Sequence, residues 1–305
     1  MSAAPIALHP AIGFHGSTGK ESNGKGFAKY LAQLRAVIPQ LTAIQIFASN
    51  PKSFAHSAWT PETNKSVKLA LSELNIRLFI HAPYIINMNA WEDTITPEGE
   101  RIVSLMVNLL QKGAEMGAEG VVVHVAKHVK AGEETGVKRM GSFIREVMAR
   151  CDIAAIPFCR LLVETPAGQG TECLKDIKHF GKFIQDIVKE HGSHNVGACV
   201  DTCHVFACGY EIRLLADLIK THIGWEHVYL IHLNDSESAC CSCKDRHAPI
   251  GHGKIGQKSL SSFCRQAAEA SPTLAFVLET PSTEYSDHIS EVDWFTSLFE
   301  HTSAV

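Results

Sequence analysis

The 305-residue sequence predicts an α/β protein, a single (β/α)8 TIM barrel over residues 1–305 with a metal cluster at the carboxyl-terminal face of its strands. Short apolar runs rich in β-branched residues alternate with amphipathic stretches, which is typical of parallel strands joined by crossover helices. Eight alternations in a chain longer than about 250 residues favour a closed barrel over an open sheet. A dinucleotide-binding open sheet would carry a GxGxxG turn after its first strand. Residues 13–19 do not match that motif, so the sequence gives little support to a dinucleotide-binding site.

Eight apolar runs are the expected strands. They cover Ala11–His15, Ala43–Phe47, residues 76–81, residues 120–124, Arg160–Glu164, Val196–Asp201, Val228–His232 and residues 274–279. The segments between them carry signals of helix ends. Thr60 and Thr96 each place a capping hydroxyl before a first-turn proline, and Gly117 stands where a helix should close. Phe27, Leu31, Leu34 and Ile38 form one apolar face before Pro39 ends that segment. We find no linker-like run and therefore no domain boundary.

The composition limits the class of protein. The formal net charge of −4 argues against a protein that binds nucleic acid mainly through a basic surface, so the positive field would have to come from elsewhere, such as bound divalent cations. No run of about 20 apolar residues predicts a membrane span, and the first residues lack the features of a signal peptide. We expect an intracellular monomer without membrane contact, whose ten cysteines stay as thiols.

Six expected strands end in a residue of a metal-binding type. These residues are His81, His124, Glu164, Asp201, His232 and Glu279. Any one of them alone could be a satisfied polar group at the end of a buried strand. Because the carboxyl ends of parallel strands emerge on one face of a barrel, all six should point into one mouth. Three carboxylates gathered there would repel one another, and divalent cations would remove that repulsion.

Three further candidate ligands lie just past two of these strands. His204 comes three residues after Asp201, and Asp245 and His247 flank Arg246 in the loop after the seventh strand. Nine ligands suffice for three ions at three to four protein ligands each. Nitrogen and oxygen donors without thiolate favour Zn²⁺, with Mn²⁺ or Fe²⁺ in part of the cluster. Such a site suits in-line displacement at phosphorus.

At these residues the chain resembles the endonuclease IV family of abasic-site endonucleases, from the first strand to the last. The motifs that carry the resemblance are VETPAGQGTE around Glu164, VDTCHVFACGY from Val200, HLNDS from His232, DRHAPIGHGKIG from Asp245 and VLETP around Glu279. The resemblance implies a (β/α)8 barrel with three zinc ions. It implies one ion on His81, His124 and Glu164, a second on Glu164, Asp201, His232 and Glu279, and a third on His204, Asp245 and His247.

The resemblance also implies an activity in base excision DNA repair. A metal-bound hydroxide would cut the phosphodiester bond 5′ of an abasic site in duplex DNA, leaving a 3′-hydroxyl and a 5′-deoxyribose phosphate, with Glu164 and Glu279 as catalytic residues. The expected DNA-binding residues are Asn50, Lys52, Tyr84, Asn87 and Arg246. Tyr84 also has an ordinary interpretation as a partly buried loop aromatic, and Lys52 as a solvated charge. Lys52 and Phe54 depart from the Arg and Trp expected of the family at these positions, a difference that bears on lesion insertion more than on the metal chemistry.

Two other functions stay open. A sugar isomerase or epimerase on the same barrel would gather Glu, Asp and His around one divalent ion, and five of the nine ligands would then be surplus. A noncatalytic DNA-damage-binding protein would keep the barrel and lose the chemistry. Two smaller features receive no catalytic role. We expect free thiols in the run Cys240, Cys241 and Cys243, and a packing or supporting role for His15 near the mouth.

Overall fold

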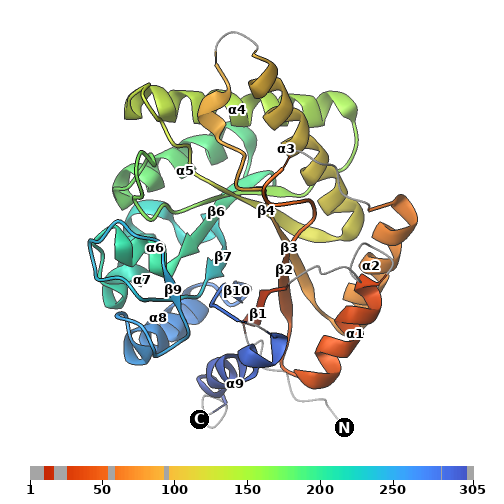
Figure 1. Ribbon diagram of the computed structural model, residues 1–305, viewed down its shortest axis with the longest axis vertical. Helices are drawn as coiled ribbons and strands as arrows, with labels where there is room; N and C mark the ends of the chain where they lie inside the picture. Colours follow the sequence, from red (N-terminus) through yellow and green to blue (C-terminus); the bar gives the residue numbers. More distant parts are fainter. Residues whose placement is uncertain (1–9, 17–25, 54–58, 93–95, 283, 301–305) are drawn as a thin grey trace.

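The computed structural model describes residues 10–16, 26–53, 59–92, 96–282 and 284–300. Eight parallel strands close into a barrel in the order β1, β10, β7, β6, β5, β4, β3, β2, which confirms the predicted fold. Figure 1 shows the helices arranged around this ring of strands. The strands are β1 (Ala11–His15), β2 (Ala43–Phe47), β3 (Arg77–His81), β4 (Ala118–His124), β5 (Arg160–Glu164), β6 (Val196–Asp201), β7 (Val228–His232) and β10 (Ala275–Leu278).

Five of the eight strands have the predicted bounds, and three predictions were wrong at the ends. β3 begins one residue later than predicted because the amide of Ile76 donates to the carbonyl of Leu71 at the preceding helix end. β4 begins two residues earlier, since Ala118 pairs with Leu78. β10 is one residue shorter at each end, and Glu279 lies just beyond it because its amide donates to the side chain of Asn234.

The helices follow the predicted capping signals. The hydroxyls of Thr60 and Thr96 accept from the amides three residues on, and Gly117 closes its helix with φ of 78°. The α-helices are α1 (Phe27–Val37), α2 (Pro61–Leu74), α3 (Pro97–Met116), α4 (Glu133–Ala154), α5 (Ile177–His191), α6 (Thr202–Ala207), α7 (Leu215–Leu218), α8 (Gln257–Ala270) and α9 (Ile289–Ser297). Shorter turns of helix are η1 (Met88–Ala90), η2 (Ile212–Leu214), η3 (Ile219–Ile223), η4 (Trp225–His227) and η5 (Tyr285–His288). Within the described ranges, no helix is long and apolar enough to cross a membrane.

The core has two layers, because successive side chains of a strand point to opposite faces. The larger layer packs between the strands and the helices and includes Leu31, Ile44 and Phe276. The smaller layer fills the barrel interior and includes Ala43, Phe79 and Leu230. The filled interior leaves polar side chains to gather at one end, the carboxyl-terminal mouth of the strands.

A small antiparallel pair braces the long loop after β7. It consists of β8 (Asp235–Ser236) and β9 (His247–Ala248). The buried carboxylate of Asp235 accepts backbone amides from the segment that follows β9, including those of Gly251 and Ile255 at 3.0 and 2.9 Å. This loop carries two of the predicted ligands, Asp245 and His247, back over the barrel mouth.

Candidate metal centre

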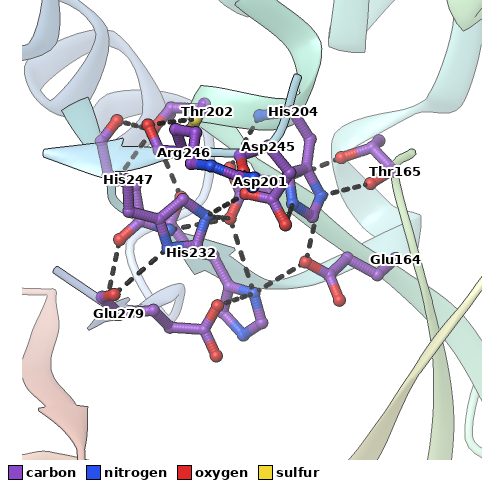
Figure 2. Close-up of polar contacts among 12 residues, drawn as sticks. Glu164, Thr165, Asp201, Thr202, His204, His232, Asp245, Arg246, His247 and Glu279 are labelled. Carbon is purple, nitrogen blue, oxygen red and sulfur yellow. Dashed lines mark hydrogen bonds and ion pairs between the residues drawn. The ribbon is translucent and has the colours of Figure 1, made fainter. Parts of the chain in front are cut away.

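The nine predicted ligands meet at the barrel mouth. Figure 2 shows Glu164, Asp201, His232 and Glu279 pointing toward one another from four strand ends, and their ligand atoms lie within 4.8 Å of one another. Two further groups meet the same distance limit. One is His81, His124 and Glu164, and the other is His204, Asp245 and His247. Cys203 also lies within this range of Asp201 and His247, a neighbour to which sequence reasoning assigned no role.

Glu164 stands between these groups. Its Oε2 atom lies 3.5 Å from Nε2 of both His81 and His124. Its Oε1 atom lies 3.0 Å from Nδ1 of His232 and 3.3 Å from Nδ1 of His204. One carboxylate therefore faces two sets of donors, one with each oxygen.

The third group closes over this carboxylate from the loop. Asp245 lies 3.3 Å from Nε2 of His204 and 3.1 Å from Nε2 of His247. Nε2 of His247 also lies 3.6 Å from Oδ2 of Asp201, so the loop and the strand ends form one continuous cluster. Asp201 is held in turn by Asn234, whose side-chain amide donates to Oδ2 at 2.7 Å.

Backbone carbonyls orient three of the histidines. A carbonyl oxygen can only accept, so Nδ1 of each ring carries the proton and Nε2 is left free to face the cluster. The pairs are His81 with the carbonyl of Ala82 at 2.7 Å, His204 with that of Thr165 at 2.8 Å and His247 with that of Glu279 at 3.1 Å. Such bonds are the usual support of metal-binding histidines.

His232 is oriented the other way by Gln45, a residue that the sequence reasoning missed. Oε1 of Gln45 lies 2.9 Å from Nε2 of His232, which leaves Nδ1 to face the carboxylates. Nε2 of Gln45 donates to Oε1 of Glu279 at 2.6 Å, and His15 lies 3.2 Å from the same oxygen. Gln45 is fully buried in β2. The signal was present, because a polar residue stands in the middle of the otherwise apolar run AIQIF.

In the metal-free protein, the histidines and carboxylates of the cluster shift one another's pKa. Burial would raise the pKa of the Glu164 carboxyl, but the surrounding histidines, His124 and His232 first, hold it well below its usual range. Burial likewise opposes ionisation of His204, yet Asp201 and Asp245 raise its pKa well above the ordinary value. His124 has less carboxylate around it, and burial lowers its pKa to about 4.

Unpaired buried atoms test whether the cluster fits a metal. Oε2 of Glu164 and the Nε2 atoms of His204 and His247 are buried without a well-aligned hydrogen bond from the described part of the chain, although Asp245 lies 3.3 and 3.1 Å from the two Nε2 atoms. Buried polar atoms left in this way are costly, and all three face the cluster. Divalent cations would pair each of them, and imidazole with carboxylate is a donor set that suits Zn²⁺. The residues therefore fit a metal cluster.

The predicted DNA-binding residues stand around the mouth. Asn50, Lys52 and Arg246 are exposed, and Tyr84 is 60% exposed with its ring 5.5 Å from that of His81. Asn87 is half-buried, and its amide pairs with both backbone groups of Lys127 in the loop after β4. Tyr84 and Asn87 line an open pocket of about 220 Å³ above the cluster. Phe54 lies outside the described residues.

The comparisons with known proteins agree with this arrangement. A family model described as a xylose isomerase-like TIM barrel matches residues 40–298. The chain is 28% identical over 305 residues to a probable endonuclease 4 of Streptomyces avermitilis, which covers 98% of this chain and 91% of that protein. It is 31% identical over 263 residues to the probable endonuclease 4 of Symbiobacterium thermophilum, with 85% and 91% covered.

Solved structures show the same likeness. Endonuclease IV from Thermus thermophilus matches with a TM-score of 0.76 and 27% identity, covering 95% of this chain and 99% of that one. A D-tagatose 3-epimerase-like protein shares the fold alone, with a TM-score of 0.67 and 14% identity. The sequence motifs, the barrel and these matches together place the chain in the endonuclease IV family of xylose isomerase-like TIM barrels.

Proposed function

We propose that this protein is a metal-dependent DNA-repair endonuclease that hydrolyses the phosphodiester bond 5′ of abasic sites in duplex DNA, leaving a 3′-hydroxyl and a 5′-deoxyribose phosphate. One observation carries the proposal. Nine nitrogen- and oxygen-donor side chains form three groups that meet at one open barrel mouth. The relatives named probable endonuclease 4 support the same activity.

The three groups would hold three zinc ions, or zinc with Mn²⁺ or Fe²⁺ in part of the cluster. His81, His124 and Glu164 would hold the first, and Glu164, Asp201, His232 and Glu279 the second. His204, Asp245 and His247 would hold the third. Bound divalent ions supply Lewis acidity, lower the pKa of water and offset the charge of phosphoryl oxygens.

The chain's own contribution is to fix the ligand atoms in place. Glu164 turns one oxygen to each of two groups, which keeps the groups at a set separation. Glu279 is held by the side chain of Gln45 and through its amide by Asn234. Positions fixed before substrate arrives need no reorganisation during reaction, which is the basis of electrostatic catalysis. Glu164 and Glu279 are therefore our candidates for the catalytic residues.

The rim, formed by the predicted DNA-binding residues around the barrel mouth, would recognise the abasic site. An abasic nucleotide costs little to hold outside the helix because no base pair is broken. The exposed ring of Tyr84 stands over His81 and 5.8 Å from the ring of His124, where it would cover an extrahelical sugar. Lys52 and Arg246 are exposed cations that would contact phosphates on either side.

Cleavage of a defined duplex tests the proposal. The substrate carries one tetrahydrofuran abasic analogue and a label on the damaged strand, and the matched intact duplex is the control. We expect a single incision 5′ of the analogue, no incision of the control, and close to three zinc ions per chain by elemental analysis. Tight binding of the damaged duplex without incision would instead support a noncatalytic damage-binding protein.

A sugar isomerase or epimerase is the second candidate. One observation favours it, because Glu164, Asp201, His232 and Glu279 form by themselves a four-ligand group sufficient for one divalent ion. The other five ligands then have no role, although three histidines among them are held by backbone carbonyls in a ligand-like orientation. One metal per chain with turnover of ketoses and no incision would replace the proposed function by this one.

A further inference from the structure

A pair of cysteines lies beside the candidate metal centre and takes no part in it. Cys208 follows the last residue of α6, and Cys240, Cys241 and Cys243 belong to the loop after β8. This loop is docked on the end of α6. The amide of Cys241 donates to the carbonyl of Phe206 at 3.2 Å, and that of Cys243 donates to the carbonyl of Ala207 at 3.0 Å.

The sulfur atoms of Cys208 and Cys243 are neighbours. A Cβ atom built on Gly168 would lie 3.2 Å from each of the two Sγ atoms, so they are at most twice that distance, 6.4 Å, apart. The hydrogen bond from Cys243 to Ala207 also limits the separation of the two α-carbons to about 7 Å by standard bond lengths. Disulfides span α-carbons about 4.4–6.8 Å apart, so a small approach of the loop brings this pair into range.

The sulfur of Cys241 lies against Gly209, whereas those of Cys208 and Cys243 share the Gly168 position. A Cβ added at Gly209 would lie 3.4 Å from the Sγ atom of Cys241. The groups of metal-ligating atoms in the described ranges include none of the four cysteines, which disfavours a structural zinc site here. Cys208 and Cys243 are thus the two thiols of this region that are set to react with one another.

The loop backbone is strained at the cysteines. Cys241 and Cys243 adopt φ of 63° and 52°, the left-handed region that glycine or asparagine occupies at lower cost. Strained positions that keep a chemically reactive side chain are candidates for function.

We propose that Cys208 and Cys243 form a reversible disulfide when the protein meets a peroxide. Cys243 is exposed and reacts first. Its sulfur attacks the peroxide, the O–O bond breaks, and a sulfenic acid forms with release of water or an alcohol. The Cys208 sulfur then attacks the sulfenic sulfur, the S–S bond forms, and the hydroxyl leaves as a second water with the Cys208 proton. The peroxide takes the two electrons, and a dithiol restores both thiols.

The order of events follows from the surroundings of the two thiols. Cys208 is only partly exposed, and its thiol donates to the carbonyl of Pro166 at 3.2 Å. Cys208 is therefore less accessible to a peroxide than Cys243, which is exposed to solvent. Cys208 reacts only after Cys243 has become a sulfenic acid. This assigns the peroxide-sensing role to Cys243 and the resolving role to Cys208.

The bond would reach the candidate third metal group. The amide of Cys208 donates to the carbonyl of His204 at 2.9 Å, and Cys243 is two residues from Asp245. His204 and Asp245 face one another at 3.3 Å. Drawing the two sulfurs to bonding distance would shift Asp245 against His204. The oxidised protein would then bind less metal at His204, Asp245 and His247. This consequence rests on the proposed function, whereas formation of the disulfide is independent of that function.

Thiol counting and peptide mapping test the disulfide directly. The full chain is reduced, desalted, exposed to a small excess of hydrogen peroxide and denatured without reductant. We expect titratable thiols to fall from ten to eight, because the bond consumes two, and to return to ten with dithiothreitol. Trypsin leaves Cys208 in residues 190–213 and Cys243 in residues 221–244, and fragmentation of the linked peptide locates the bond.

Two variants separate this pair from its neighbours. Cys243→Ser should keep all nine of its thiols under the same treatment, whereas the control Cys241→Ser should fall from nine to seven. A bond that maps to Cys240 or Cys241, or oxidation of Cys243 to a sulfinic acid without a link, would overturn the proposal. If the Cys208–Cys243 bond forms and bound zinc is unchanged, the effect on the third group is overturned and the disulfide stands. Failure of the reduced protein to cut abasic DNA would count against the proposed function alone.

Discussion

Replacement of Gln45 by methionine should weaken metal binding without unfolding the barrel. Methionine has a similar length and fits an apolar interior. It removes the acceptor for Nε2 of His232 and the donor to Oε1 of Glu279, two bonds of 2.9 and 2.6 Å. Without Gln45, nothing in β2 holds His232 in the tautomer that leaves Nδ1 free for a metal.

The size of the effect follows from the buried bonds that are lost. Loss of an outer partner of a metal-binding histidine costs about 10–100-fold in metal affinity. At about 1.4 kcal/mol for each factor of ten, this is about 1.4–2.8 kcal/mol. One buried polar group left without its partner costs a similar ~1–3 kcal/mol. We therefore expect Gln45→Met to bind zinc about 10–100-fold more weakly.

Competition with a chelator of known affinity measures this change. Ile46→Val is the matched control, because Ile46 is fully buried in the same strand and packs in the layer between strands and helices. That variant should lose about 0.5–1.5 kcal/mol of stability and no zinc affinity. Wild-type zinc affinity in a folded Gln45→Met protein would refute the role of Gln45.

Four further predictions address the site, the rim, the barrel and the effect of pH. Glu164→Gln should lower turnover by more than about 100-fold with the barrel intact by circular dichroism, because it removes the charge shared by two ligand groups; full activity would exclude the shared role. Tyr84→Ala should reduce the ratio of abasic to intact duplex bound while elemental analysis finds the wild-type metal content, and loss of metal would contradict its place on the rim. Gly13→Ala should prevent folding, measured as soluble yield, because the added Cβ would lie 1.6 Å from a backbone oxygen of β2. The control Gly141→Ala in α4 places its Cβ where nothing lies within 4 Å, and it should raise the free energy of urea unfolding by about 0.5–1 kcal/mol. Burial opposes ionisation of His247, but neighbouring carboxylates raise its pKa from 6.5 to about 9. A pKa raised by folding stabilises the metal-free protein below pH 6.5, and this stabilisation is lost as the pH rises through about 9, so the melting temperature measured in chelator should fall between these values. A melting temperature that stays constant over this interval would argue against a protonated His247 ring.

Local pattern was enough to predict the barrel. β-Branched runs and capping residues act through neighbours in sequence, so five strands have the predicted bounds. Thr60 and Thr96 begin helices, and Gly117 ends one, as expected. The error at β3 came from a local hydrogen bond at the end of α2, whereas those at β4 and β10 arose where a distant partner decides the boundary. Glu279, for example, leaves the sheet because its amide finds the side chain of Asn234, 45 residues away.

The candidate ligands could also be named from sequence, because parallel strands must end on one face of a barrel, five strands end in a donor, and a sixth is followed directly by one. Sequence alone did not decide how those donors face one another. Only the closed barrel places Gln45 between His232 and Glu279, since β2 and β7 lie apart in the chain and meet across the interior. Only the docking of a loop on α6 sets Cys243 beside Cys208. Residue types and local elements follow from short-range preference, whereas partners in space follow from chain closure, which no short stretch of sequence contains.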